Sequence, residues 1–270
     1  MVDFAAVKDG QRATWTAGDF SEIAKYIVVC SGEALNALNP QPGQHLLDIA
    51  CGTGNLAIPA AQRGAVVTGL DLTPKLLDVA RARATDAGVN VEWIEGDAEA
   101  LPFPDDSFEL VASVFGIIFA PQRDVAAAEI TRVCKPGGHF AITSWTREGM
   151  NGRLFQTMGK HMPPAPPEIG TPVEWGDEDY VAERFAPSGA ELTFVRKTVD
   201  FTADSIDEWV AYNERTLGPA VMAKAALEPQ GRWDAVRADV VDLYNEFNVA
   251  DDGTFIGRAE YLLAMGTMPG

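Results

Sequence analysis

Three aspartates at regular intervals are the residues whose types and spacing best suit ligand binding. Asp48, Asp71 and Asp97 each stand at or just past the carboxyl end of a successive predicted strand. After the first strand, residues 52–57 (GTGNLA) fit the GxGxxA form of a nucleotide-binding loop. Because the carboxyl ends of parallel strands meet at one edge of a sheet, the loop and the three acids are expected to converge on one ligand.

The chemistry of these groups suits an adenosine that carries an amino acid. Asp71 can accept hydrogen bonds from both ribose hydroxyls, and Asp97 can accept one from the exocyclic amine of adenine. Asp48 would hold the glycine loop in shape and face the amino-acid end. A nicotinamide-dependent oxidoreductase shares the GxGxxA loop and the acid after the second strand, so the loop alone does not separate the two cofactors. Ordinary strand-end and turn aspartates are the alternative explanation.

The elements that must position these residues are repeated βα units around a mainly parallel sheet. The strands are predicted at 45–50, 66–71, 91–95, 108–115 and 138–145, with helices at 54–63, 74–87 and 122–134. Thr73 before Pro74 reads as a helix N-cap with proline in the first turn.

The flanking segments have different patterns. An apolar stripe over 15–38 predicts helix against the sheet. Five prolines within 161–172 predict a loop or lid. Further elements are predicted as a strand at 191–201, helices at 204–217 and 231–248, and a last strand at 258–268.

These motifs resemble those of the class I S-adenosylmethionine-dependent methyltransferases, and within them the ubiquinone/menaquinone C-methyltransferases. The resemblance covers about 15–145 and rests on residues 46–54 (LLDIACGTG), 69–73 (GLDLT), 96–103 (GDAEALPF), 106–111 (DSFELV) and 132–138 (RVCKPGG). It implies an α/β, Rossmann-like three-layer sandwich with a mainly parallel seven-stranded sheet. An antiparallel last strand would complete the edge, and accessory helices would cover the acceptor site.

The resemblance also implies a single domain, with a division of labour along the chain. The parts are an N-terminal helical cap at 1–40, a cofactor-binding core at 41–146, and acceptor-binding lid or helical insertions at 147–190 and 203–250.

The cofactor implied is S-adenosylmethionine, with S-adenosylhomocysteine as product. Carried over by position, the cofactor contacts would be Ala50, Gly52 and Gly54 for the methionine end, Asp71 and Leu72 for the ribose, Asp97 and Ala98 for adenine, Ser113 or Val114 beside the sulfonium, and Trp15, Gly18 and Asp19 in a segment that closes over the cofactor.

The acceptor pocket is expected to be lined by large apolar side chains. They are Phe115, Ile117, Ile118 and Phe119 after the fourth strand, Trp145 after the fifth, and parts of 150–180 and 205–222. This lining favours a hydrophobic small molecule, with O-methylation of a phenol, a hydroxyquinolone-like compound or a carboxylic acid preferred. Plain core packing is the alternative for 115–119. The long proline-rich stretch after Trp145 departs from the quinone-methylating enzymes and argues against a quinone.

A catalytic base is optional when the acceptor is acidic. Of the three histidines, His45 and His139 begin strands and so fall at the end opposite the binding edge. His161 lies in the segment that should cover the acceptor, and it is the base candidate.

Composition excludes several classes of protein. A formal net charge of -18 argues against a nucleic-acid partner. No apolar run is long enough to span a membrane, and residues 1–10 lack the apolar block of a signal peptide, so a cytoplasmic protein is expected. Cys30, Cys51 and Cys134 show no CxxC spacing, and neither a metal site nor a disulfide framework is expected. A cofactor-binding module without catalysis is a further alternative, because fold does not guarantee activity.

Overall fold

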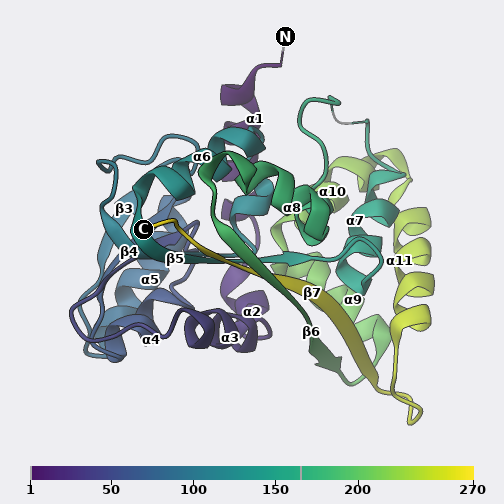
Figure 1. Cartoon of the computed structure of the whole chain (residues 1–270). Helices are drawn as coiled ribbons and strands as arrows, with labels where there is room; N and C mark the ends of the chain where they lie inside the picture. Colours follow the sequence, from purple (N-terminus) through teal and green to yellow (C-terminus); the bar gives the residue numbers. More distant parts are fainter. Residues whose placement is uncertain (1, 165) are drawn as a thin grey trace.

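A seven-stranded sheet forms the centre of the molecule (Figure 1). The structure is a computed structural model, and it describes residues 2–164 and 166–270. In sheet order the strands are β3 (Glu92–Glu95), β2 (Val66–Asp71), β1 (His45–Ile49), β4 (Phe108–Val114), β5 (Cys134–Trp145), β7 (Phe255–Thr267) and β6 (Glu191–Ala203). Strands β1 to β5 are mutually parallel, and β7 is antiparallel to both of its neighbours. The predicted α/β fold, with a mainly parallel sheet and an antiparallel last strand, is confirmed.

The position of the last strand differs from the expected one. β7 lies between β5 and β6, so the strand at this edge is β6. The burial of the two strands explains the order. Four consecutive residues of β7, from Tyr261 to Ala264, are buried, as in a strand covered on both faces. β6 has mostly exposed and half-buried side chains, which suits an edge strand.

Helices cover both faces of the sheet (Figure 1). On one face lie α3 (Val28–Leu38), α4 (Ala57–Gln62) and α5 (Pro74–Asp86), and on the other lie α6 (Arg123–Val133) and α8 (Glu178–Phe185). Thr73 is the N-cap of α5 as predicted, although its side chain makes no capping hydrogen bond. These two helical layers and the sheet form the expected three-layer sandwich.

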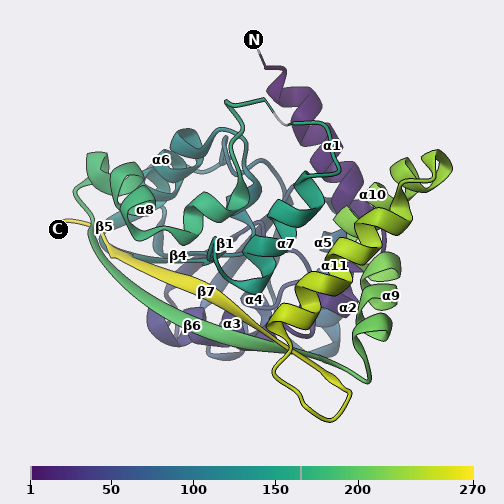
Figure 2. The same cartoon turned by 90° about the vertical axis from the view of Figure 1, so that its right-hand side faces the viewer.

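A second group of helices stands beside the sheet, on the right in Figure 1 and facing the viewer in Figure 2. It comprises α7 (Met150–Gly159), α9 (Ile206–Thr216), α10 (Gly218–Leu227) and α11 (Trp233–Phe247). The predictions at 204–217 and 231–248 correspond to α9 and α11. The helices α7, α8 and α10 were not predicted from the sequence pattern.

The N-terminal segment is more helical than its apolar stripe indicates. It forms α1 (Phe4–Thr16) and α2 (Phe20–Ala24) before α3, and α1 packs beside α10 (Figure 2). None of the α1 residues is buried. The helix is therefore a covering element rather than part of the core.

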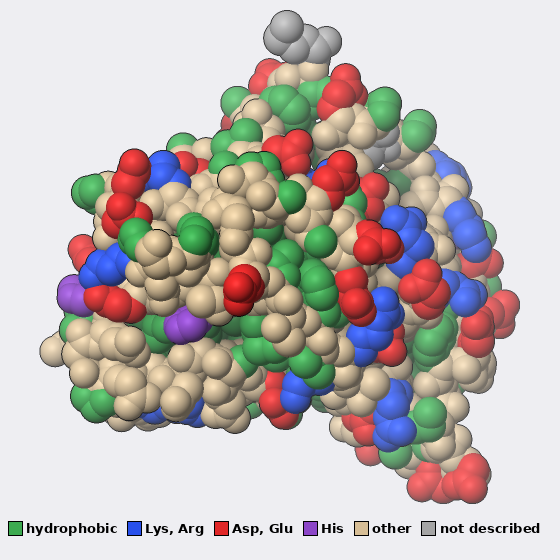
Figure 3. Space-filling view, in the orientation of Figure 1, with side chains coloured by type: hydrophobic (Ala, Val, Ile, Leu, Met, Phe, Trp, Pro, Cys, Tyr) green, Lys and Arg blue, Asp and Glu red, His purple; other side chains and the backbone are tan. Residues whose placement is uncertain are grey.

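The surface carries acidic and basic side chains interspersed over the face shown in Figure 3. Over the described part of the chain, no helix is long and apolar enough to cross a membrane.

Candidate active site

The glycine loop turns sharply out of β1. Ala50, Gly52 and Gly54 all have left-handed backbone conformations, with φ of 53°, 54° and 80°. At Gly54 a Cβ atom would lie 2.8 Å from the Trp93 ring, so a side chain has no room there. A left-handed φ is uncommon for a residue other than glycine, so the backbone at Ala50 is strained, as is often found at functional sites.

Two buried aspartates hold this loop. Asp71 accepts hydrogen bonds from the backbone N–H of Gly52 and of Thr73, each at 2.8 Å. Asp48 accepts one at 3.1 Å from the N–H of Ala57, the first residue of α4. Burial raises the pKa of both carboxyl groups, that of Asp48 to about 8. The predicted role of Asp48 in shaping the loop agrees with this contact.

Arg83 of α5 braces the loop from outside. Its Nη1 donates to the Thr53 carbonyl at 2.6 Å, to the Thr53 hydroxyl at 3.0 Å and to Asn55 Oδ1 at 2.9 Å. Burial lowers the pKa of this guanidinium, which nevertheless stays charged. The arginine ties the loop to the following βα unit, a link that no local motif predicts.

A lysine of α1 covers the loop around Asp97, where the sequence predicts the adenine. Lys8 Nζ lies 2.6 Å from Asp97 Oδ2 and 2.5 Å from Glu99 Oε2, and the Glu99 side chain is fully covered. Burial alone would lower the pKa of Lys8, but its hydrogen bonds to the two carboxylates outweigh this effect and raise it. Asp97 therefore has a protein partner in addition to the adenine amine predicted for it.

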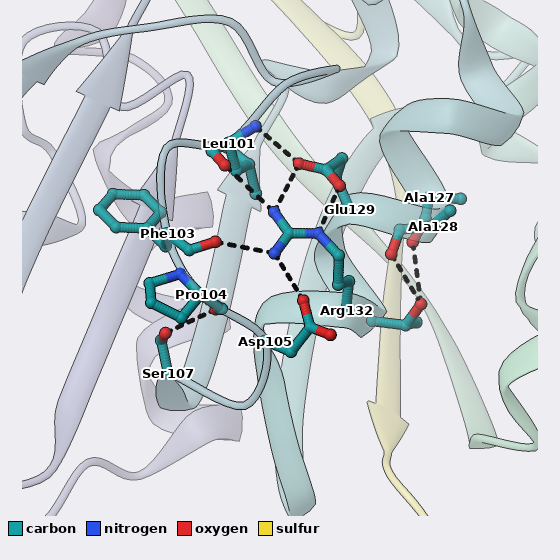
Figure 4. Close-up of polar contacts among 10 residues, drawn as sticks. Leu101, Phe103, Pro104, Asp105, Ser107, Ala127, Ala128, Glu129 and Arg132 are labelled. Carbon is teal, nitrogen blue, oxygen red and sulfur yellow. Dashed lines mark hydrogen bonds and ion pairs between the residues drawn. The ribbon is translucent and has the colours of Figure 1, made fainter.

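The loop that continues from Asp97 is fixed by Arg132 (Figure 4). Its guanidinium donates to the carbonyls of Phe103 and Leu101 at 2.7 and 3.1 Å, and it pairs with Asp105 at 2.9 Å. Glu129, one turn earlier on α6, holds the guanidinium at 2.6 Å and also accepts from the Leu101 N–H. Hydrogen bonds to these carboxylates raise the pKa of Arg132. The arginine thus gives the segment 101–105 a defined position between β3 and β4.

Helix α1 lies over the site and is attached mainly by polar contacts. Gln11 donates to the Phe119 carbonyl, Arg12 donates to the Leu72 carbonyl at 3.1 Å, and Lys75 of α5 donates to the Thr16 carbonyl at 2.8 Å. Trp15 adds an edge-to-face contact with Phe119, with ring centroids 4.9 Å apart.

One cavity of about 790 Å³ runs from the glycine loop to the helices α7, α9, α10 and α11. It contains most of the residues that the sequence singles out. Those lining it are Trp15, Asp48, Ala50, Gly52, Asp71, Leu72, Asp97, Ala98, Val114, Phe115, Phe119 and Trp145.

Seven residues that the sequence analysis placed in the site do not line the cavity: Gly18, Asp19, Gly54, Ser113, Ile117, Ile118 and His161. Gly54 serves the turn, as described above. Ser113 is buried and uses its hydroxyl within the fold, donating to the Ile49 carbonyl at 2.8 Å and accepting from the Ile117 N–H at 2.9 Å. Ile118 is buried in the core, the alternative that its apolar character allowed.

His161 also lies outside the lining, and its geometry does not support a base. Its Nε2 lies 2.8 Å from Asp239 Oδ2 on α11. Its own carbonyl accepts a hydrogen bond from Arg232. The ring therefore links the loop after α7 to α11, next to the cavity but not inside it.

The half of the cavity away from the glycine loop has an aromatic wall. Phe115 stacks on Trp145 with centroids 3.9 Å apart, and Trp145 contacts Phe201 at 6.1 Å. Phe201 in turn contacts Trp209 at 5.4 Å. All four rings line the cavity, and Tyr244 of α11 lines it further on. Burial raises the pKa of Tyr244 well above its ordinary value, so its hydroxyl stays protonated at neutral pH.

Several lining residues come from segments that the sequence analysis assigned to the cap or to the acceptor side without naming these residues. Lys8, Gln11 and Thr14 come from α1, and Asn151, Leu154, Phe155 and Met158 come from α7; α9, α10 and α11 contribute Asn213, Glu214, Met222, Trp233, Arg237 and Tyr244. The amphipathic pattern of α9 and α11 predicts one buried face, but it does not say that this face meets a cavity.

Comparison with known proteins agrees with the geometry. The family model described as "Methyltransferase domain" matches residues 46–138. The chain is 36% identical over 219 residues to an uncharacterized protein of Mycobacterium tuberculosis, covering 79% of each chain. It is 37% identical over 161 residues to the ubiquinone/menaquinone biosynthesis C-methyltransferase UbiE of Paracoccus denitrificans, covering 53% of this chain and 64% of that protein. The YcgJ protein from Bacillus subtilis has the same fold, with a TM-score of 0.63 at 19% identity over 89% of this chain and 98% of that one.

The chain belongs to the class I S-adenosylmethionine-dependent methyltransferases. S-adenosylmethionine is its cofactor, which decides against the nicotinamide alternative left open by the glycine loop. The cavity fits this cofactor. Its glycine-loop end carries Asp71 and Asp97 against Lys8, the one cation among the described lining residues there, and this acidic balance suits a positively charged sulfonium. Asp48 at the same end is protonated near neutral pH because burial raises its pKa to about 8.

Proposed function

We propose that this methyltransferase methylates an oxygen of a hydrophobic small molecule whose own acidity makes it a nucleophile: a phenol, a hydroxyquinolone-like compound or a carboxylic acid. The observation that carries the proposal is the lining of the acceptor half of the cavity. It is largely apolar and aromatic, and all three histidines of the chain lie outside it. An acceptor that ionises readily needs no strong base from the protein.

The other ionisable groups near the acceptor are poor bases. Tyr244 stays protonated, as its raised pKa requires. Glu214 already accepts hydrogen bonds from Lys224 and Trp233 and forms an ion pair with Arg237. The acceptor would therefore lose its proton to water before transfer and react as the anion.

Bound S-adenosylmethionine supplies an electrophilic methyl group on a sulfonium. The carbon–oxygen bond forms as the carbon–sulfur bond breaks, and the electron pair of that bond stays on sulfur. The protein contributes orientation and exclusion of water. Val114 and Phe115 line the cavity where the two halves meet, and the ring of Phe115 would hold a planar acceptor in line with the methyl group.

The test is a transfer assay with isotopically labelled S-adenosylmethionine against phenols, hydroxyquinolones, fatty acids, quinones and thiols. Label in an O-methyl product is expected. Label found only in a thioether or on a quinone carbon would contradict the proposal, and so would cofactor binding without transfer to any of these acceptors.

A pair of α7 variants localises the acceptor. Leu154 lines the cavity and Gln156, two residues on, is exposed outside it. Leu154→Glu should abolish transfer and leave cofactor affinity unchanged, because a charge is unfavourable in an apolar pocket. Gln156→Glu adds the same charge to the same helix and should leave both properties unchanged.

A further inference from the structure

The acidic and basic side chains that line the cavity fall into two separate sets. Four stand at the glycine-loop end, and the other two, Glu214 of α9 and Arg237 of α11, stand in the acceptor half. α11 lies at the far side of the molecule from α4 and α5 (Figure 1). Charged groups in an apolar wall are costly to desolvate and contribute little stability, so their presence there calls for a role in recognition.

The Glu214 carboxylate already has protein partners for both of its oxygens. Its side chain is only 11% exposed. Oε2 accepts from Lys224 Nζ at 2.7 Å, and Oε1 accepts from the Trp233 indole N–H at 3.1 Å and faces Arg237 Nε at 3.5 Å. One buried negative charge thus faces two cations.

Not all N–H groups of the Arg237 guanidinium are used within the described part of the protein. Nη2 donates at 2.8 Å to Asp207, whose side chain is 76% exposed and therefore strongly screened by water and salt. Among the described residues, Nη1 makes no hydrogen bond. Counted together, Glu214, Asp207, Lys224 and Arg237 carry no net charge. Asp207 is the most exposed of the four, so its pairing with Arg237 is the one that water and salt weaken most.

We propose that Arg237 binds a carboxylate on the acceptor, at the end of that molecule remote from the methylated atom. A guanidinium that pairs with Glu214 through Nε and donates to Asp207 through Nη2 holds Nη1 in the same fixed plane, where its N–H groups can meet a carboxylate. The aromatic wall from Phe115 to Trp209 then accommodates the body of the acceptor between the two ends. The substrate class is an elongated, aromatic, monoanionic molecule with a methyl-accepting hydroxyl at one end and a carboxylate at the other.

The proposal rests on the proposed function, but it can be tested without methyl transfer. The protein loaded with S-adenosylhomocysteine is titrated calorimetrically with 4-hydroxyphenyl-alkanoic acids of increasing chain length and with their primary amides. For at least one chain length, the acid should bind the wild-type protein about tenfold tighter than the amide, because only the acid forms the charged pair. Raised salt should reduce this ratio.

Variants assign the effect to the residue. Arg237→Met should bring the acid-to-amide ratio close to one, and Arg237→Lys should keep part of it. Arg153 of α7, which pairs with Glu246 of α11 and does not line the cavity, provides the control, and Arg153→Met should keep the full ratio. A thermal melt of each variant shows whether it folds. If Arg237→Met does not fold, Arg237→Lys still tests the proposal.

Three outcomes would overturn the proposal: equal binding of acid and amide to the wild type, a ratio unchanged in Arg237→Met, or no binding of either compound at any chain length. Full discrimination without methyl transfer to the phenol would instead refute the proposed phenol acceptor and leave the carboxylate site standing. Methyl transfer to the phenol with equal binding of acid and amide would refute the carboxylate site and leave the phenol acceptor standing.

Discussion

Phe115 stacks on Trp145 with ring planes only 10° apart, and it does so from a left-handed backbone with φ of 55°. Its N–H donates to both the carbonyl and the hydroxyl of Thr143, at 3.2 and 3.1 Å. A bulky residue seldom adopts this conformation, and it persists only where its surroundings hold it. The strained residue stands where the cofactor half of the cavity meets the acceptor half.

Substitutions of Phe115 should separate packing from strain. Phe115→Ala should lower the free energy of unfolding by about 3 kcal/mol, because the stacked ring is lost from a buried site. Phe115→Gly should be about 1 kcal/mol more stable than Phe115→Ala, since glycine accepts a positive φ. Phe119, whose φ is not positive, is the control: there the alanine variant should be the more stable one. Denaturant unfolding measures all four, and the same order at both positions would contradict the strain.

Asp71 should govern cofactor affinity. Asp71→Asn keeps a side chain of the same shape but loses the charged acceptor for the ribose hydroxyls, so S-adenosylmethionine should bind at least about tenfold more weakly. Asp78→Asn removes a charge from the exposed face of α5 and should leave affinity unchanged. Calorimetric titration checks both, and unchanged affinity in Asp71→Asn would refute the ribose assignment.

Arg83 should matter through the loop that it braces. Arg83→Met leaves the Thr53 carbonyl and the Asn55 side chain without their donor, so we expect cofactor affinity to fall severalfold and stability to fall by about 1 kcal/mol. Arg81→Met, two residues earlier on the same helix, breaks only the exposed pair with Asp78 and should change stability by less than about 0.5 kcal/mol. Equal effects of the two variants would show that the brace is unimportant.

His161 provides a test of the sequence-based hypothesis of a base. Because its ring binds Asp239 and does not line the cavity, His161→Asn should leave the turnover number nearly unchanged. Loss of a general base lowers turnover by a hundredfold or more. A loss of that size at saturating acceptor would restore His161 as the base.

The sequence predicts the cofactor end of the site better than the acceptor end, and the reason is local. Asp48 stands just before the glycine loop and Asp71 follows one βα unit later, so the βα periodicity places all three at one edge. The contact between Lys8 and Asp97 joins residues 89 positions apart, and no pattern connects them. Such a pair depends on how α1 lies across the finished fold.

Direction and packing account for the remaining differences. The strand pattern places Ser113 near the sulfonium, but its side chain points toward β1 and bonds the Ile49 carbonyl. Glycines at 152 and 159 weaken the helical signal of α7. At Gly152 a Cβ would lie 2.0 Å from the Thr146 carbonyl oxygen, so the packing of α7 requires glycine here. The same glycine lowers the helix propensity by which the sequence would have predicted α7.

Asp48 should make stability depend on pH in a direction opposite to that of an ion-paired carboxylate. Burial raises its pKa from 3.8 to about 8, so the folded protein holds the proton while the unfolded chain releases it. Between these two values the unfolded state binds fewer protons, and the contribution of this group to stability falls as pH rises, by about 1.4 kcal/mol per pH unit. Below about pH 4 the contribution is fully present.

Asp48→Asn removes this titration and keeps an oxygen that can accept from the Ala57 N–H. Unfolding by denaturant is measured at several pH values between 5 and 8 for the wild type and the variant. The difference in free energy of unfolding, variant minus wild type, should grow steadily with pH, because every other titrating group cancels in it. Asp78→Asn, exposed on α5, should give a difference that is small and nearly flat over the same range. A flat difference for Asp48→Asn would mean that Asp48 is ionised in the folded protein, and that the negative end of the cavity carries one more charge toward the sulfonium.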